Sequence, residues 1–379
     1  TNNASLGTSS PTEFKAGGHQ FLQNTVNLDL SKKFNSIFTL GLGGELRYEQ
    51  YKITDGEEGS WAQYDQFGNL VTSATSSTDI LGAGGSQGFI GFSPDNALRK
   101  DRNSAAAYAD LAFTTGKFSG NLAGRYENYS DFGNSLTGKL ALRYEYASGF
   151  AIRGAFSTGF RAPSLQQQYF NNSYTDISVS GSGIVSKGIF TNESALARAL
   201  GIEKLKEEKS LNASAGLTFR PLSRLYITAD AYYIKVDDRI VLTSEFVNPL
   251  IQSYGVEGAR FFTNAIDTET KGIDVVATYK VFIGEGNLDI SLSGNYTETE
   301  ITGYHFPEVF GGDRNEYFGP DQTNIIESLS PKTKASLGLV YNISKWNFLV
   351  RNTYFGKVTR DGYPFGSVQH HDPKLVTDF

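Results

Sequence analysis

The chain of 379 residues carries a formal net charge of −6 at pH 7 and contains no cysteine. It therefore forms neither disulfides nor thiolate metal sites, and it lacks the basic face that a nucleic-acid partner requires. No segment approaches the roughly 18 consecutive apolar residues of a membrane-spanning helix, whereas 21 Tyr, 27 Phe and 41 Gly favour strands and tight turns.

The first predicted strands follow an N-terminal loop over residues 1–18. Apolar and polar residues alternate from Val26 to Leu30, and a short turn near 33–35 leads to a longer strand over roughly 37–53. The two faces of that strand carry Leu40, Leu42, Leu46 and Tyr48 on one side, and Thr39, Glu45, Arg47 and Glu49 on the other. A period of two is the signature of a β-strand with one apolar and one polar face.

Residues 136–146 show this alternation most clearly. Two strands that meet at 116–117 and a modest loop at 130–134 precede them, and a turn at 148–149 leads into a strand over 150–160. The pattern predicts that one face of the sheet touches lipid through Leu140, Leu142, Phe156, Leu217 and Leu292, while Lys139, Arg143, Arg153 and Thr218 lie on the opposite, polar face.

The remaining strands are joined alternately by tight turns and by long connections. The turns lie at 221–223, 284–286 and 344–345, and the long connections at about 54–104, 161–209, 238–271 and 302–331. A short helix is expected within 193–205, and 374–379 resembles the first half of a strand. This gives about twelve strands plus a fragment, with all long loops on one side.

Such sidedness, combined with a fully charged polar face, predicts an all-β fold: a transmembrane antiparallel β-barrel with a wet interior. A soluble β-sandwich also alternates, but its strands are shorter and its loops have no such sidedness. Barrels of this kind place long loops outside the cell and short turns in the periplasm.

Four segments, in order along the chain, resemble motifs of the TonB-dependent outer-membrane receptors. They are TGFRAPSL at 158–165, LKEEKS at 205–210, DAYYIKVDDRI at 230–240 and FFTNAIDTETKGIDVV at 261–276, with ELRYE at 45–49 and YENYSDFG at 126–133 as further similarities. The resemblance covers essentially the whole chain. It implies the C-terminal part of a 22-stranded barrel, of which about twelve to thirteen strands are present. We expect 1–379 to form part of one barrel domain, with the plug and the terminal strands outside this chain.

The resemblance also implies a function: active import across the outer membrane of a Gram-negative bacterium. Such receptors bind a scarce ligand at extracellular loops and admit it by rearranging the plug, driven by the TonB complex of the inner membrane. The ligand class stays open between an iron-siderophore, a cobalamin, a saccharide and a peptide. Outer-membrane lipid is a further partner, and a surface lipoprotein remains an open one. The alternatives are a passive diffusion porin and, from another class, an outer-membrane barrel enzyme.

Two sets of side chains are candidates for a functional role. The first is charged and points into the lumen: Glu45, Arg47, Arg125, Glu127, Arg143, Glu145, Arg153 and Arg161. These residues either pair across strands and stiffen the wall or also contact the plug. The second set consists of loop aromatics, which either bind ligand or pack on one another above the rim: Trp61, Tyr64, Tyr169, Phe170, Tyr174, Tyr304, Phe306 and Tyr317.

The remaining chemistry-bearing residues predict no metal site, no cofactor and no enzyme. His370 and His371 are adjacent, so in a strand they point to opposite faces and cannot share a metal. Haem receptors of the family place a histidine in the region matching 164–209, where this chain has none. For Pro163, which cannot donate to a strand ladder, we expect a structural role at a strand end.

Overall fold

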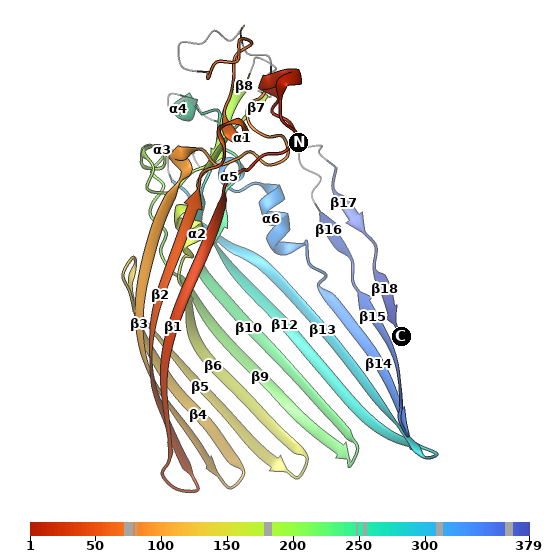
Figure 1. Cartoon of the computed structure of the whole chain (residues 1–379). Helices are drawn as coiled ribbons and strands as arrows, with labels where there is room; N and C mark the ends of the chain where they lie inside the picture. Colours follow the sequence, from red (N-terminus) through yellow and green to blue (C-terminus); the bar gives the residue numbers. More distant parts are fainter. Residues whose placement is uncertain are drawn as a thin grey trace.

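The computed structural model describes the chain except for residues 72–78, 80–81, 178–183, 248, 253–255, 308–313 and 361–366, and leaves the side chains of 173–177, 184–186 and 249–250 undescribed. Its dominant feature is one sheet of thirteen antiparallel strands, which bends into an open trough (Figure 1). The strands, in order across the sheet, are β1 (Gly18–Lys33), β2 (Phe38–Thr54), β3 (Leu98–Thr115), β4 (Phe118–Tyr129), β5 (Gly133–Ala147), β6 (Phe150–Arg161), β9 (Glu208–Leu222), β10 (Leu225–Leu242), β12 (Phe262–Ile283), β13 (Gly286–Tyr304), β14 (Thr333–Ile343), β15 (Trp346–Phe355) and β18 (Lys374–Asp378). The predicted twelve strands and a fragment are confirmed.

The tight turns gather at one end of the trough and the long connections at the other (Figure 1). Gly116 and Gly284 adopt φ of 53° and 59° in two of these turns, where the left-handed backbone of a two-residue hairpin favours glycine. Ser344 takes the same conformation, with φ of 52°, between β14 and β15. The prediction that long loops and tight turns lie at opposite ends of the strands is therefore confirmed.

Several predicted strand ends were wrong, mostly because the strands extend further into the expected loops. The connections expected at 54–104 and 238–271 are shorter, because β3 already begins at Leu98, and β10 and β12 continue to Leu242 and from Phe262. In these upper segments polar side chains lie on both faces of the strand, with Arg99 and Asp101 on one face of β3 and Lys100 and Arg102 on the other. The hydropathy alternation therefore fades although the ladder continues. The turn expected at 221–223 lies at 223–224.

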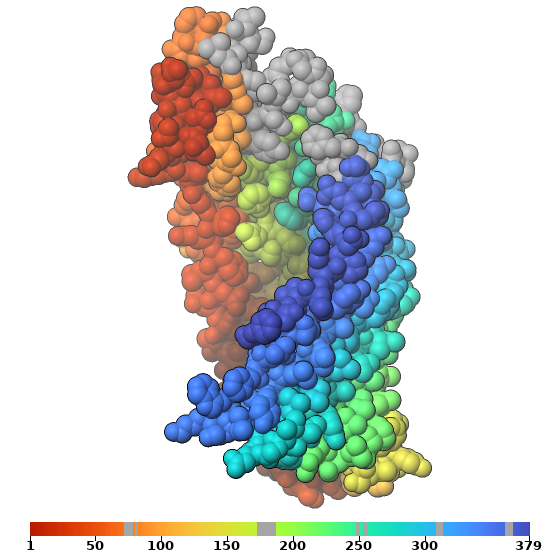
Figure 2. Space-filling model, turned by 90° about the vertical axis from the view of Figure 1, so that its right-hand side faces the viewer, coloured from red at the N-terminus to blue at the C-terminus, as the bar shows by residue number. Residues whose placement is uncertain are grey.

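The two faces of the sheet separate as predicted. Cross-strand partners share a face, and Leu140 opposes Phe156 while Lys139 opposes Ser157. Leu140 is 43% exposed on the outer face. The concave face holds a hollow of about 460 Å³ whose walls include Lys139 and Arg125. Figure 2 looks into the trough between its two free edges.

Above the rim, the long connections fold over one another. They contain a small sheet of β7 (Asn172–Ile177), β8 (Ile184–Ile189) and β11 (Gly258–Arg260), the pair β16 (Val358–Arg360) and β17 (Gln369–His371), and the short helices η1 (Ala4–Ser9), α1 (Glu58–Trp61), η3 (Pro94–Asn96), α2 (Leu165–Tyr169), α3 (Ala195–Ala199), α4 (Pro249–Gln252), α5 (Arg314–Tyr317) and α6 (Pro320–Glu327). Helix α3 confirms the helix expected within 193–205. In the described parts of the chain, no helix is long and apolar enough to cross a membrane.

Two apolar clusters hold these connections together. The larger one buries Leu200, Phe246, Phe261 and Tyr317, among others, beside the upper ends of β10 and β12. The smaller one consists of Tyr51, Ile53, Phe92 and Leu165, on which Leu98, Tyr169 and Phe170 pack. The loop region is therefore a packed layer on top of the barrel wall.

The orientation of this layer can be tested by labelling. The chain has no cysteine of its own, so Asn69→Cys and Glu285→Cys each create a single thiol. Asn69 is exposed in the loop layer, and Glu285 lies in a tight turn. We expect an impermeant thiol reagent added to whole cells to label the Asn69 variant and not the Glu285 variant. Labelling of the turn alone would reverse the orientation. The loop at Gly181, which the same argument places outside the cell, lies beyond the described residues.

Candidate functional site: the lumen wall and the loop layer

Charged side chains on the concave face form ion pairs, both along one strand and across neighbouring strands. Arg47 and Glu45 lie 2.6 Å apart, and Arg125 binds both Glu45, at 3.4 Å, and Glu127, at 2.6 Å. Glu45 and Glu127 come from β2 and β4, with Ala106 between them on β3. The methyl side chain of alanine leaves room for longer side chains to meet across it. Of these contacts, the one between Arg125 and Glu45 crosses strands, as the wall-pairing interpretation predicts.

In a second group of charged side chains, an arginine and an aspartate meet across a glycine on the strand between them. Arg153 of β6 contacts Asp230 of β10, with Nη2–Oδ2 and Nε–Oδ1 distances of 2.5 and 2.8 Å. Gly216 of β9 lies between the two in register, and a Cβ there would clash with the Asp230 carboxylate. Arg143 opposes Arg153 directly and pairs with Glu145 at 3.3 Å. The sequence singled out the arginines but not Asp230, because only the fold brings β6 and β10 into reach.

The segment Arg161–Leu165 forms a joint between strands and loops. The guanidinium of Arg161 forms a bidentate ion pair with the carboxylate of Glu208, and the Nε of Arg161 lies 2.7 Å from Oε2 of Glu208. Glu208 also accepts a hydrogen bond from the backbone N–H of Ile240 at 2.7 Å. Ser164 caps α2 by accepting from Gln167 N at 3.0 Å. The segment that carries the family motif is thus a structural joint between β6, β9, β10 and α2.

Arg102 completes this joint from the other side. Its guanidinium donates through Nε to Glu49 at 2.8 Å and through Nη1 to the backbone oxygen of Pro163 at 2.6 Å. It also approaches Asp131 at 3.4 Å and lies over the ring of Tyr129, although the side chain is only 4% exposed. A buried arginine with four partners ties β2, β3, the β4–β5 turn and the motif segment together. The sequence offered no signal for Arg102, since this part of the chain was expected to be loop.

The predicted loop aromatics are mostly engaged in packing. Tyr64 donates to Glu58 at 2.9 Å, the Tyr169 ring lies 4.8 Å from the Lys100 ammonium, and Phe170 packs edge-on against Phe92. The other members behave similarly: Trp61 donates to Gly56 O, and Tyr304 lies under Arg314 and against Phe318. Phe306 and Tyr317 pack against each other and also line a pocket. The side chain of Tyr174 lies outside the described residues.

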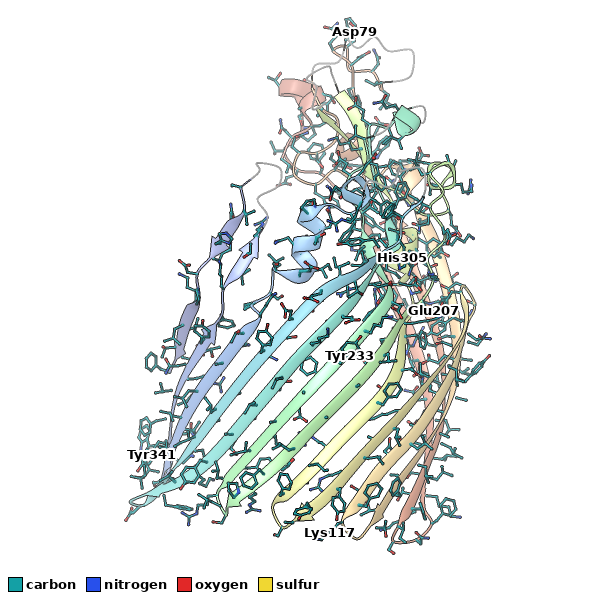
Figure 3. All side chains as sticks on the ribbon, turned by 180° about the vertical axis from the view of Figure 1, so that it is seen from behind. Asp79, Lys117, Glu207, Tyr233, His305 and Tyr341 are labelled. Atoms are coloured by element: carbon teal, nitrogen blue, oxygen red, sulfur yellow. The ribbon has the colours of Figure 1, made fainter. Side chains whose placement is uncertain are left out.

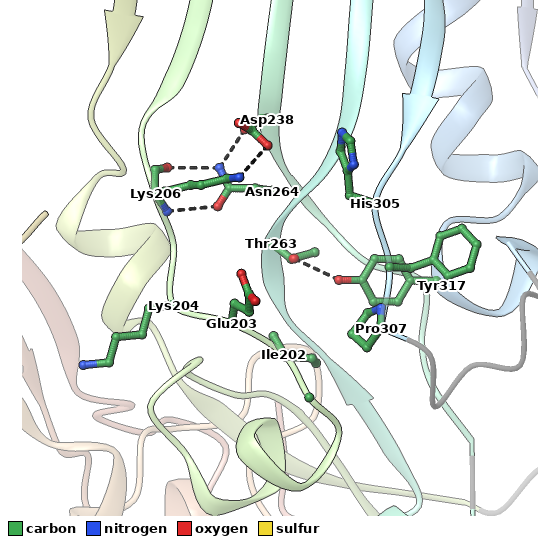
Figure 4. A pocket seen from close by; sticks show the side chains of 12 residues that line it. Ile202, Glu203, Lys204, Lys206, Asp238, Thr263, Asn264, His305, Pro307 and Tyr317 are labelled. Atoms are coloured by element: carbon green, nitrogen blue, oxygen red, sulfur yellow. Dashed lines mark hydrogen bonds and ion pairs between the residues drawn. The ribbon is translucent and has the colours of Figure 1, made fainter. Parts of the chain in front are cut away.

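That pocket, with a volume of about 350 Å³, lies where the loop layer meets the upper ends of β10, β12 and β13 (Figure 4). Lys206 Nζ contacts Asp238 Oδ1 at 2.9 Å, and Asn264 Nδ2 donates to the backbone oxygen of Asp238 at 2.6 Å. His305 Nε2 lies 2.9 Å from Asp267 Oδ2. The hydrogen bond to Asp238 raises the pKa of Lys206 above its usual value, so the ammonium stays charged.

Asp238, Asp267 and His305 have ligand atoms that lie within 4.8 Å of one another, which is close enough for one cation. The sequence predicted no metal site, because these residues meet only when β10, β12 and the residue after β13 lie side by side. Both carboxylates already have cationic or hydrogen-bonding partners, Lys206 and His305. Within the described residues, an ion pair with Lys206 and a hydrogen bond with His305 thus already occupy these carboxylates.

Tyr317 makes the loop layer sensitive to alkali. Burial raises its pKa to about 12, and its hydroxyl donates to Thr263 at 2.8 Å. Because the folded pKa lies above the unfolded value of about 10, the stabilisation is complete below pH 10 and is lost as the pH rises towards 12. A spectrophotometric titration should show one late-titrating tyrosine fewer in Tyr317→Phe than in the parent chain, where burial also raises the pKa of Tyr51 and Tyr64 to about 12. Equal titration curves for both proteins would contradict a buried, protonated Tyr317.

Comparisons with known proteins fit this geometry. The family described as TonB dependent receptor-like, beta-barrel matches residues 1–378. The chain belongs to the TonB-dependent receptor barrels. This membership confirms the predicted family and fold, and it places the chain in the outer membrane of a Gram-negative bacterium. It also supports a transporter rather than an enzyme.

Individual relatives are distant from this receptor barrel. The vitamin B12 transporter BtuB of Vibrio cholerae is 29% identical over 69 residues, which cover 18% of this chain and 11% of BtuB. The siderophore receptor PirA of Acinetobacter baumannii is 13% identical, with a TM-score of 0.57 over 95% of this chain and 47% of PirA. The FrpB iron transporter of Neisseria meningitidis is 11% identical, with a TM-score of 0.59 over 95% of this chain and 48% of FrpB. The receptor barrel thus spans about half the length of the solved chains it resembles, and these likenesses show the fold alone.

Proposed function

We propose that this barrel is part of a TonB-dependent active importer, which binds a scarce ligand outside the cell and admits it when a plug rearranges. The observation that carries the proposal is the family match along residues 1–378. The charged side chains of the concave wall would offer ion-pair and hydrogen-bond partners to a plug. The energy would come from the TonB complex of the inner membrane.

The plug contact, in this proposal, is made by the charged lumen set. The exposure of several of its members supports this role: the side chains of Arg143 and Glu145 are each 44% exposed, and that of Arg161 is 51% exposed. A plug carbonyl or carboxylate would add charge-assisted hydrogen bonds to the exposed guanidinium groups. The same role is proposed for Glu45, Arg47, Arg125, Glu127 and Arg153.

For the ligand, we propose a small molecule of the kind that the relatives' names mention, a siderophore or a cobalamin; a saccharide or peptide remains the alternative. The loop aromatics that are only partly buried would supply the contact surface, above all Trp61, Tyr64 and Phe306. Aromatic rings with a few placed polar groups are typical of small-molecule sites. A surface lipoprotein would be a partner for saccharides or peptides.

Uptake measurements test the proposal. Cells that express the full-length receptor should accumulate one of a panel of labelled ligands, comprising ferric siderophores, cobalamin, oligosaccharides and peptides. Accumulation should stop when the proton gradient is collapsed or TonB is deleted. Uptake that ignores both treatments would favour the rival, a passive diffusion porin.

A further inference from the structure

The tight-turn end of the sheet carries exposed cations that no carboxylate neutralises. They lie in four of the hairpin turns or within a few residues of them, and we call them the turn-end cations. The set consists of Lys32, Lys33, Lys117, Arg220, Arg224 and Lys345. In the parts of the chain that the structure describes, none of them forms an ion pair with a carboxylate. Their positive charge is therefore uncompensated.

Neutral groups hold some of these cations in place without cancelling their charge. Lys117 Nζ donates to the backbone oxygen of Tyr146 at 2.9 Å, and the Arg224 guanidinium lies 4.4 Å from the centroid of the Phe282 ring. An ammonium group has three N–H donors and a guanidinium has five. Most of these donors stay free for an anion from outside the chain.

The carboxylates of the same end are too few to balance the positive charge. The segments that contain the six hairpin turns are 32–38, 115–118, 143–151, 219–226, 280–289 and 341–348. Of their three carboxylates, Glu145 pairs with Arg143 at 3.3 Å and Asp289 pairs with Lys280 at 3.1 Å, which leaves Glu285. The turn end therefore has an excess of positive charge, although the whole chain carries a net charge of −6.

Exposed aromatic rings place these cations at the surface of the bilayer. Trp346, next to Lys345, is 69% exposed, and Tyr146, whose backbone oxygen binds Lys117, is 67% exposed. Tryptophan and tyrosine are enriched where hydrocarbon meets the head groups. A cation one residue beyond such a ring lies about 3.4 Å further along the strand, within a head-group layer of about 5–7 Å. Figure 3 labels Lys117 and Tyr341 at this end.

The length of the turns keeps the cations at this level. The β3–β4 and β14–β15 turns have two residues each, so Lys117 and Lys345 cannot extend beyond the head groups on a longer loop. An anion that meets them there is part of the membrane itself.

We propose that the turn-end cations are a docking surface for the phosphate groups of anionic phospholipids in the leaflet at this end of the barrel. A lipid with a net negative charge, such as phosphatidylglycerol, is favoured over zwitterionic phosphatidylethanolamine because the protein supplies no carboxylates to neutralise these cations. In the orientation expected from the loop lengths, this is the periplasmic leaflet. The role does not depend on import, since it uses the rim of the barrel and not the lumen.

Quenching of Trp346 fluorescence by lipids with brominated acyl chains measures which lipid lies beside Lys345. The full-length receptor, with Trp346 as its single tryptophan, is reconstituted in equal mixtures of phosphatidylglycerol and phosphatidylethanolamine, and one lipid is brominated in each sample. We expect phosphatidylglycerol to be preferred about five-fold beside Trp346, the ratio for one basic residue at an anionic surface. Lys345→Gln should bring this ratio close to one. The matched control Lys271→Gln, at the loop end of the wall, should leave it unchanged.

A second reporter position tests whether the preference extends along the rim. Phe118→Trp in the Trp346→Phe background places the fluorophore beside Lys117, and Lys117→Gln should lower the ratio there in the same way. Inorganic phosphate at millimolar concentration should leave both ratios unchanged, because it lacks the acyl chains that hold a lipid at this level. A ratio near one at both positions of the parent receptor, ratios that the glutamine variants do not lower, or displacement by free phosphate would overturn the proposal.

Discussion

Replacing Arg102 with Met should destabilise the loop layer by about 3–5 kcal/mol, because it leaves a buried carboxylate without its partner. Glu49 is almost fully buried and loses its contacts to Nε and Nη2, at 2.8 and 2.7 Å. The backbone oxygen of Pro163 loses its donor at the same time. Hydrogen-exchange mass spectrometry should show faster exchange in 161–170 and in the upper parts of β2 and β3.

A nearby arginine supplies the control for this variant. Arg99 lies on the same strand, but its side chain is 64% exposed and its contact to Asp101 is long, at 3.9 Å. Arg99→Met should change exchange very little, since exposed ion pairs contribute 0–1 kcal/mol. If the Arg102 and Arg99 variants exchanged alike, the joint at the motif segment would not depend on the buried guanidinium.

Replacing Leu140 with Arg should cost roughly 2–4 kcal/mol of barrel stability in a bilayer, the range for a cation facing lipid near the midplane. Leu140 lies in the middle of β5 on the outer face, with Phe156 beside it. Equilibrium unfolding by denaturant in lipid vesicles, followed by tryptophan fluorescence, measures the change.

Lys139, the residue before Leu140, provides the control variant because it lies on the opposite face of the same strand. Lys139→Leu changes the lumen face, where the wall is polar and lipid is absent, so it should leave the barrel assembled and close to parental stability. A larger loss for Lys139→Leu than for Leu140→Arg would mean that the two faces are exchanged.

The sequence predicts the wall well wherever lipid enforces the pattern. Around Leu140, Phe156 and Leu292 one face must be apolar, so the period of two is unmistakable. Above the membrane that constraint ends, and segments such as 98–104 and 262–271 form strands with polar groups on both faces. Their pairing is decided by the ladder that continues from the membrane segment, which residue type alone does not reveal.

The candidate site was predictable only in part, for the same reason. Arg161 and Pro163 could be recognised as a structural segment because a motif marks them. Arg102 and Asp230 acquire their roles from contacts across strands, and Asp267 meets His305 only through the pairing of β12 with β13. Small residues such as Gly216 set these contacts, and their importance shows only when the neighbouring side chains are in place.

Conductance of the full-length receptor in a planar lipid bilayer tests the central claim most directly. If the lumen is filled by a plug that rests on the charged wall, the intact protein should pass very little current. Deletion of the plug-encoding segment should then open a large, steady conductance through the same strands. Large constitutive currents from the intact protein, unchanged by the deletion, would contradict the importer and support a passive porin.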